Sequence, residues 1–158
     1  MCAILDANAA GLVFSSRTTE AENKSASKRF FDWIDSGPGS LVAGGELLGE
    51  LDKVSNFQKW RKRAMSAGRI AILDENAVNQ KASQVSPHCK SDDPHVIAVA
   101  LISNARFLYS NDGDLQKDFR DPNLVNNPRG SVYSTRQGNN FTQDHRRLLM
   151  KNMCKRGQ

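Results

Sequence analysis

The sequence predicts an α/β protein, a three-layer α/β/α sandwich around a central, mainly parallel sheet. Two observations predict it: short apolar runs recur along the chain, and segments with helical spacing of apolar residues separate them. Strands that alternate with helices need crossover connections, and right-handed crossovers place helices on both faces of a parallel sheet. A chain of 158 residues and 17.5 kDa suffices for one such domain and leaves little room for a second.

The predicted strands are the apolar runs 2–5, 40–43, 70–73, 107–110 and 131–134. The first, third and fourth are apolar on both faces, which is typical of parallel strands covered on both sides. The predicted helices are 21–35, 46–53, 57–67 and 94–103. The last is almost wholly apolar and is predicted to be buried.

Positive charge is concentrated at the end of the chain. The protein has 22 Lys and Arg against 17 Asp and Glu, a formal net charge of +5. Residues 133–158 contain six basic side chains and one acid, so residues 1–132 hold 16 of each and are neutral. The excess charge therefore belongs to the tail, where Leu149, Met150 and Met153 form an apolar strip and 141–157 is predicted to be a last helix.

The sequence favours a cytoplasmic protein. The N-terminus has no basic lead-in and no cleavable apolar stretch, and the longest clean apolar run, 96–102, is far too short to span a membrane. The three cysteines (Cys2, Cys89 and Cys154) are odd in number and widely spaced, which does not predict a disulfide framework or a zinc ribbon.

Four acids lie where this scaffold would bring them together. Asp6 and Asp112 follow the first and fourth predicted strands, Glu46 opens the helix after the second, and Asp93 precedes the buried helix. In an open α/β sheet the carboxyl ends of the strands and the amino ends of the following helices share the edge that carries the ligand crevice. We therefore expect the four carboxylates to converge.

Clustered carboxylates repel one another unless a cation neutralises them. Oxygen ligands without His or Cys select Mg²⁺ or Mn²⁺. Such a site is suited to phosphodiester hydrolysis, because the cation lowers the pKa of a coordinated water, orients it for in-line attack and stabilises charge on the phosphate.

Three of the four acids also have an ordinary structural explanation. Asp93 before Pro94 is a good helix cap, 111–114 reads as a turn, and Glu46 favours the positive end of its helix. An ordinary explanation fits Asp6 least well, because aspartate is depleted in strands and this one follows four residues of buried-strand type. Four acids at one predicted edge favour a site over four unrelated caps.

Short motifs surround these acids: Asp6-Ala7-Asn8, Glu46-Leu47-Leu48-Gly49, Asp93-Pro94-His95-Val96-Ile97-Ala98 and Leu108-Tyr109-Ser110-Asn111-Asp112-Gly113-Asp114. In this order and at these separations they resemble the motifs of the PIN-domain nucleases. The resemblance covers nearly the whole chain and is weakest after about Ser134. It implies a PIN-like, Rossmann-like nuclease domain over residues 1–135, followed by the basic tail over 136–158.

The resemblance also implies a function, that of a Mg²⁺- or Mn²⁺-dependent ribonuclease. Asp6, Glu46, Asp93 and Asp112 would be the catalytic, metal-binding acids and Asp114 an accessory ligand. Asn8 and Ser110 would orient the carboxylates. Many small bacterial members are toxins held by a co-encoded antitoxin, and many dimerise, so RNA, an antitoxin and a second copy are the implied partners. Two positions stay open: Glu50 for Glu46, and Asp92 for Asp93.

Other readings compete with this one. A non-catalytic PIN-like module that binds RNA or protein is the second hypothesis. Asp74, after the third strand, invites comparison with the phosphoacceptor of a receiver domain, but Asp6 has no acidic neighbour and no Lys follows the last strand. A zinc site from His88, Cys89, Asp92, Asp93 and His95 is disfavoured because the spacing fits no familiar zinc pattern.

Basic residues provide candidate contacts to RNA phosphates. Lys59–Arg63 is a basic run on a predicted helix, and either it forms a solvated outer face with Trp60 turned inward, or Arg61 and Lys62 line the RNA path. Arg146 and Arg147 in the tail are the other candidates.

Overall fold

The computed structural model describes residues 2–14 and 21–134, with side chains from residue 27 in the second range. The described part contains the strands β1 (Cys2–Leu5), β2 (Ser40–Gly44), β3 (Ile70–Leu73), β4 (Phe107–Tyr109) and β5 (Ser131–Tyr133). They form one sheet in the order β3-β2-β1-β4-β5, and every neighbouring pair is parallel. The predicted fold class, a Rossmann-like α/β protein, is confirmed. The tail over 136–158, with Arg146, Arg147 and the expected last helix, lies outside the described residues.

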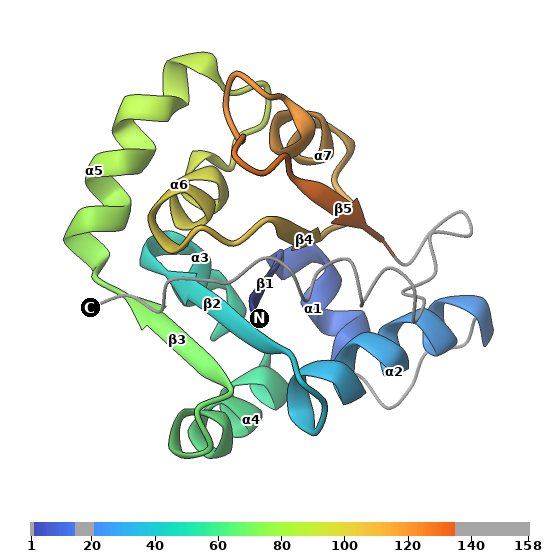
Figure 1. Ribbon diagram of the computed structural model, residues 1–158. Helices are drawn as coiled ribbons and strands as arrows, with labels where there is room; N and C mark the ends of the chain where they lie inside the picture. The colour runs from blue at the N-terminus through green and yellow to red at the C-terminus, as the bar shows by residue number, and fades with distance from the viewer. Residues whose placement is uncertain (1, 15–20, 135–158) are drawn as a thin grey trace.

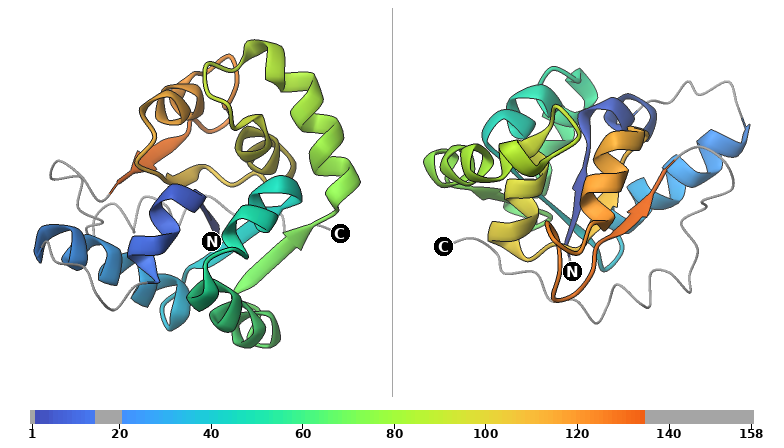
Figure 2. Two further views of the ribbon diagram at one scale, coloured as in Figure 1. Left: turned by 180° about the vertical axis from the view of Figure 1, so that it is seen from behind. Right: turned by 90° about the horizontal axis from the view of Figure 1, so that it is seen from above.

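The helices are α1 (Ala7–Val13), α2 (Ala21–Asp35), α3 (Gly45–Leu51), α4 (Ser55–Ser66), α5 (Glu75–Val85), α6 (Pro94–Ser103) and α7 (Gly113–Arg120), with a 3₁₀ turn η1 (Ser86–His88). The bounds of α2 and α6 agree with the prediction, and those of α3 and α4 differ from it by one or two residues. Figure 1 and the reverse view in Figure 2 show α5, α6 and α7 on one side of the sheet and α2 and α4 on the other.

Three helices were missed because they are short or mostly polar. α1 has only seven residues, and α7 has eight within a stretch that reads as turn and loop. α5 is mostly polar, and of its apolar stripe only Val78 is fully buried, whereas Ala82 and Val85 are partly buried. Each follows a strand, where a parallel sheet requires a crossover element.

The core lies on both faces of the central strands. β1, β2 and β4 are buried along their whole length, and Val96–Ala100 of α6 is fully covered. The ring of Phe30 stacks on Tyr109 with centroids 4.4 Å apart. β3 is an edge strand in which Ala71 and Ile72 are only half-buried, so the expectation of a strand covered on both faces is wrong there.

Arg106 is a buried cation that closes the end of α6. Its guanidinium donates hydrogen bonds to the carbonyl oxygens of Ala100, Asn126 and Pro128. The Ala100 carbonyl belongs to the last turn of α6, where helical carbonyls lack intrahelical partners and attract positive charge. Burial lowers the pKa of Arg106.

One expectation about membrane segments and one about cysteines can be compared with the structure. None of the helices in the described ranges is long and apolar enough to cross a membrane. Cys89 is a free thiol, whereas Cys2 is disulfide-bonded, which the cysteine spacing did not predict.

Candidate metal centre

The sheet brings Asp6 and Ser110 together at its carboxyl edge. β1 and β4 are neighbours with Leu5 opposite Tyr109, so the next residues, Asp6 and Ser110, leave the sheet side by side. The Ser110 hydroxyl donates to Oδ2 of Asp6 at 2.6 Å, and Oγ of Ser110 accepts from the Asp112 amide at 3.0 Å. The Asp6 residue is only 4% exposed. A single hydroxyl thus connects two of the predicted acids.

Asp112 caps a helix and also lies at the carboxyl edge of the sheet. Its Oδ1 accepts from the amides of Asp114 and Leu115 and caps α7. Asp114, the predicted accessory ligand, is 62% exposed at its side chain and lies 3.9 Å from Lys117. The structure therefore brings Asp112 to the edge beside Asp6 but leaves Asp114 on the solvent side of α7.

Asp93 stands before α6 without capping it through its side chain. Its carboxylate makes no cap hydrogen bond to α6, whereas Asp74 caps α5 and Asp112 caps α7. A helix cap alone therefore does not account for the Asp93 carboxylate. Asp74, the alternative phosphoacceptor, is exposed and accepts from the Ala77 amide.

The loop before Asp93 is held by a residue that sequence reasoning missed. The carboxylate of Asp118 on α7 is 2% exposed and accepts from the amides of Lys90 and Ser91 at 2.9–3.0 Å. The sequence does carry a signal for it, because Leu115, Asp118 and Phe119 share one face of α7 at helical spacing. A buried carboxylate with backbone donors thus fixes the segment that presents Asp93.

The predicted acids are electrostatically coupled. Burial raises the pKa of Asp6 above 3.8, the Ser110 hydrogen bond opposes that rise, and the charges of Asp93 and Asp112 add to it. Burial also raises the pKa of Asp93, against the lowering effect of His95, and the charges of Asp112, Asp92 and Glu46 add to the rise. Asp6 therefore responds to the charges of Asp93 and Asp112, and Asp93 responds to those of Asp112 and Glu46.

His95 lies among the carboxylates; the sequence suggested it beside Asp93 only as part of the disfavoured zinc set, without Glu46 or Glu50. Its side chain is 3% exposed, with Nδ1 3.5 Å from Oε2 of Glu46 and Nε2 3.7 Å from oxygens of both Glu50 and Asp93. Neither ring nitrogen has a hydrogen-bond partner among the residues that the structure describes. Glu50, Asp93 and His95 form a group whose ligand atoms lie within 4.8 Å of one another and could hold a metal ion. A lone histidine in an otherwise apolar helix was the available signal.

Both glutamates of α3 lie beside His95, and Glu50 is the one that belongs to this group. The helix begins at Gly45, so Glu46 is in its first turn with a side chain 70% exposed, and Glu50 follows one turn later at 34%. Glu46 faces Nδ1 of the imidazole and Glu50 faces Nε2. Between the neighbouring aspartates, Asp92 is exposed and Asp93 is the one beside His95.

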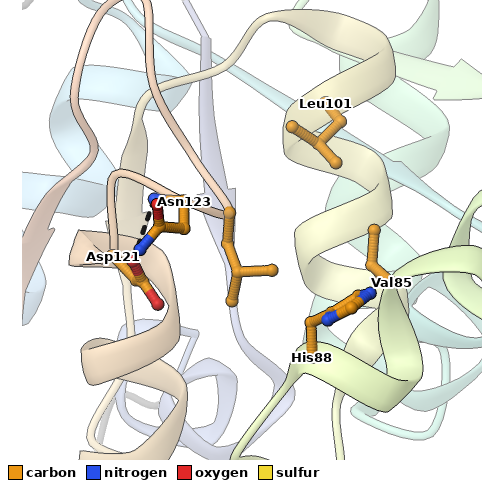
Figure 3. A pocket seen from close by; sticks show the side chains of 6 residues that line it. Val85, His88, Leu101, Asp121 and Asn123 are labelled. Atoms are coloured by element: carbon orange, nitrogen blue, oxygen red, sulfur yellow. Dashed lines mark hydrogen bonds between the residues drawn. The ribbon is translucent and has the colours of Figure 1, made fainter.

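Two pockets adjoin α6, and they differ in chemistry. A pocket of about 320 Å³ is lined by Glu46 and His95 together with Asn79, Ala82, Ser83, Ser86 and Pro94. A second, of about 410 Å³, lies further along α6 between Val85, His88 and Leu101 on one side and Asp121 and Asn123 on the other (Figure 3). The Asp121 carboxylate there accepts from the Asn123 amide. His88 thus lines a different pocket from His95.

The remaining predicted residues lie outside the acidic group. Oδ1 of Asn8 accepts from the Asn111 amide at 3.3 Å, which ties α1 to the segment before Asp112. Trp60 is turned inward as expected, 3% exposed. Arg61 forms an ion pair with Asp52 at 2.7 Å, and Lys62 is exposed.

Comparisons with protein-family models, with curated proteins and with solved structures found no match for this chain.

Proposed function

We propose that this protein is a Mg²⁺- or Mn²⁺-dependent endoribonuclease of the PIN type that hydrolyses RNA phosphodiester bonds. The observation that carries the proposal is the hydrogen-bonded link from Asp6 through Ser110 to Asp112 at the carboxyl edge between β1 and β4, where the charge of Asp93 also acts on Asp6. This is the point where the strand order reverses, since β1 leads to β2 on one side and β3 returns to β4 on the other. Ligand crevices of open α/β sheets lie at such points.

The donor groups fit a divalent cation. Mutual repulsion and burial make the ionised forms of Asp6 and Asp93 unfavourable by themselves, and a bound cation reverses that preference. Asp6, Asp93, Asp112 and Glu46 would hold the ion. When bound, it would lower the pKa of a water and neutralise charge on the scissile phosphate.

The chain's own side chains prepare this site. Ser110 holds one Asp6 oxygen in a fixed direction, and Asp112 keeps its position because its Oδ1 is bonded to two amides of α7. Asp118 fixes the loop that carries Asp93. Carboxylates held by surrounding hydrogen bonds bind metals in one geometry and need little reorganisation.

Partners follow from the resemblance alone. RNA is the proposed substrate, and a co-encoded antitoxin and a second copy of the chain are the proposed protein partners. The basic tail would provide phosphate contacts through Arg146 and Arg147, because carboxylates cannot attract the RNA backbone. The cytoplasm is the proposed compartment.

A non-catalytic RNA- or protein-binding module is the second candidate, and His95 is the observation that favours it. A protonated imidazole beside Glu46, Glu50 and Asp93 would offset their charge without any cation. The pocket would then be an anionic surface with a built-in counter-charge rather than a metal site.

Cleavage of RNA under controlled metal conditions separates the two candidates. Chelator-treated protein is incubated with single-stranded and structured RNA, with Mg²⁺ or Mn²⁺ added back, and the products are resolved by length. We expect cleavage only with the cation, and its loss in Asp6→Asn and Asp112→Asn but not in Glu75→Gln, an exposed acid on α5. Wild-type cleavage by Asp6→Asn and Asp112→Asn would refute the nuclease site, and RNA that is bound but left intact would favour the module.

A further inference from the structure

We infer that Glu50, Asp93 and His95 form a transition-metal site that prefers Mn²⁺, Co²⁺ or Zn²⁺ to Mg²⁺, with Nε2 of His95 as a nitrogen ligand. The inference rests on the proposed function only in that both place a cation at Asp93. It concerns which ion binds and through which atoms, so binding tests it independently of RNA cleavage.

The unpartnered imidazole points to a ligand. His95 is 3% exposed, and both of its ring nitrogens lack a hydrogen-bond partner among the described residues. Buried polar groups in folded proteins are nearly always bonded, because leaving them unpaired is costly. A metal ion between Nε2 and the carboxylates would satisfy that nitrogen.

The spacing of the donor atoms suits coordination after a small adjustment. Nε2 lies 3.7 Å from Oε2 of Glu50 and 3.7 Å from Oδ1 of Asp93. These distances are too long for direct hydrogen bonds. Donor atoms bound tetrahedrally at 2.0–2.1 Å from one ion lie about 3.4 Å apart. The two distances to Nε2 are about 0.3 Å longer than that, and the ligand atoms of all three side chains lie within 4.8 Å of one another.

The other ring nitrogen has an acceptor in the right place. Nδ1 faces Oε2 of Glu46 at 3.5 Å. A metal-ligating histidine usually donates its second N–H to a carboxylate, which fixes the tautomer and raises the basicity of the ligating nitrogen. At this site Glu46 is therefore a positioning residue for His95 rather than the metal ligand of the proposed nuclease site, and Glu50 is the ligand that α3 contributes.

The nitrogen ligand sets the metal preference. Mg²⁺ takes oxygen ligands and retains several waters, whereas imidazole suits transition ions. Asp93 is the acid that the two parts of the edge share, because it precedes α6 and its Oδ1 lies 3.7 Å from Nε2 of His95. The site thus extends the Asp6–Asp112 cluster toward the pocket lined by His95 and Glu46.

Metal binding to the purified full-length chain tests the inference. Co²⁺ binding is followed by its d–d absorption, and Mn²⁺ binding by electron spin echo spectroscopy, which detects a coordinated imidazole nitrogen. We expect one nitrogen-coordinated ion per chain, retained in a tenfold excess of Mg²⁺. His95→Gln should lose the nitrogen signal and at least tenfold in affinity. His88→Gln, which alters an exposed histidine on η1, is the matched control.

A second variant guards against loss of folding at the buried histidine. Glu50 is 34% exposed, so Glu50→Gln should fold normally, keep the nitrogen signal and bind Co²⁺ at least tenfold more weakly. An unchanged nitrogen signal in folded His95→Gln, unchanged affinity in Glu50→Gln, or displacement by equimolar Mg²⁺ would overturn the inference. Asp6→Asn should keep the signal, so loss of cleavage in that variant tests the nuclease proposal alone.

Discussion

The Ser110 hydroxyl donates a 2.6 Å hydrogen bond to Oδ2 of Asp6, across 104 residues of sequence. The bond exists because β1 and β4 are parallel neighbours and both end at this level of the sheet. It is also the interaction that opposes the effect of burial on the pKa of Asp6. The Ser110 hydrogen bond therefore favours the ionised form of the buried Asp6 carboxylate.

Removal of this hydroxyl should weaken the site without unfolding the protein. In Ser110→Ala the pKa of Asp6 should rise further, and the affinity for Mn²⁺ should fall about tenfold, as it does when the outer partners of other metal ligands are removed. Calorimetric titration with Mn²⁺ measures the change. Ser110→Thr, which keeps the hydroxyl, should retain most of the affinity, and equal affinity in all three proteins would contradict this role.

The metal-free protein should become less stable as the pH rises from 4 towards neutrality. The folded-state pKa values of Asp6 and Asp93 are raised above 3.8, so between 3.8 and those values the native state binds more protons than the unfolded state. The free energy of unfolding therefore falls with rising pH across that window. Denaturant titrations of chelator-treated protein at several pH values measure the slope.

Two comparisons test this origin of the pH dependence. Asp6→Asn removes one of the two groups and should make the slope shallower. Added Mn²⁺ should stabilise the wild-type protein more at pH 7 than at pH 4.5, because protons compete with the ion for the same carboxylates. Stability that rises with pH in the metal-free protein would contradict the burial of these carboxyl groups.

Loss of the Asp118 carboxylate should loosen the segment that carries Asp93. Asp118→Ala deprives the Lys90 and Ser91 amides of their acceptor and should cost about 2 kcal/mol in stability. Hydrogen exchange at these amides should accelerate, and alkylation of Cys89 should become faster, because burial and then the charge of Asp118 raise the pKa of that thiol. Asp118→Asn keeps one acceptor oxygen and should have a smaller effect. Hydrogen exchange at wild-type rates in Asp118→Ala would contradict the role of Asp118 in holding this segment.

Charge reversal on α4 should leave RNA binding unaltered. Phe57, Trp60 and Ala64 define the buried face of α4, and Lys62 lies on the opposite face. Arg61 is already paired with Asp52, beyond the end of α3 away from Glu46. The salt dependence of RNA affinity should therefore keep its slope in Arg61→Glu and Lys62→Glu. A slope reduced by about one per substitution would instead place these residues on the RNA path.

The sequence was sufficient for the scaffold because the signals were local. Apolar runs such as 2–5 and 70–73 coincide with β1 and β3, and the apolar helix after Asp93 has the predicted bounds. The helix α5 was missed because its sequence is mostly polar and its stripe of Val78, Ala82 and Val85 is only partly buried, so its position is better predicted from the crossover that the sheet requires.

Part of the candidate site could likewise be predicted from local signals in the sequence, and part could not. The approach of Asp6 to Asp112 was predictable because strand order and helix starts fix the carboxyl edge, whatever the side-chain packing. The meeting of Glu50 with His95 depends instead on how α3 packs against α6, which no local pattern encodes. Asp118 likewise acquires its role only when α7 packs against the loop before α6.

The sequence by itself thus determined an α/β fold and the edge at which its acids gather, since periodicity and chain order are properties of the sequence. Only the tertiary structure decided that a buried histidine lies among those acids, with one nitrogen towards Glu46 and the other towards Glu50 and Asp93. The physical reason is that contacts between helices depend on the packing of side chains across the whole core.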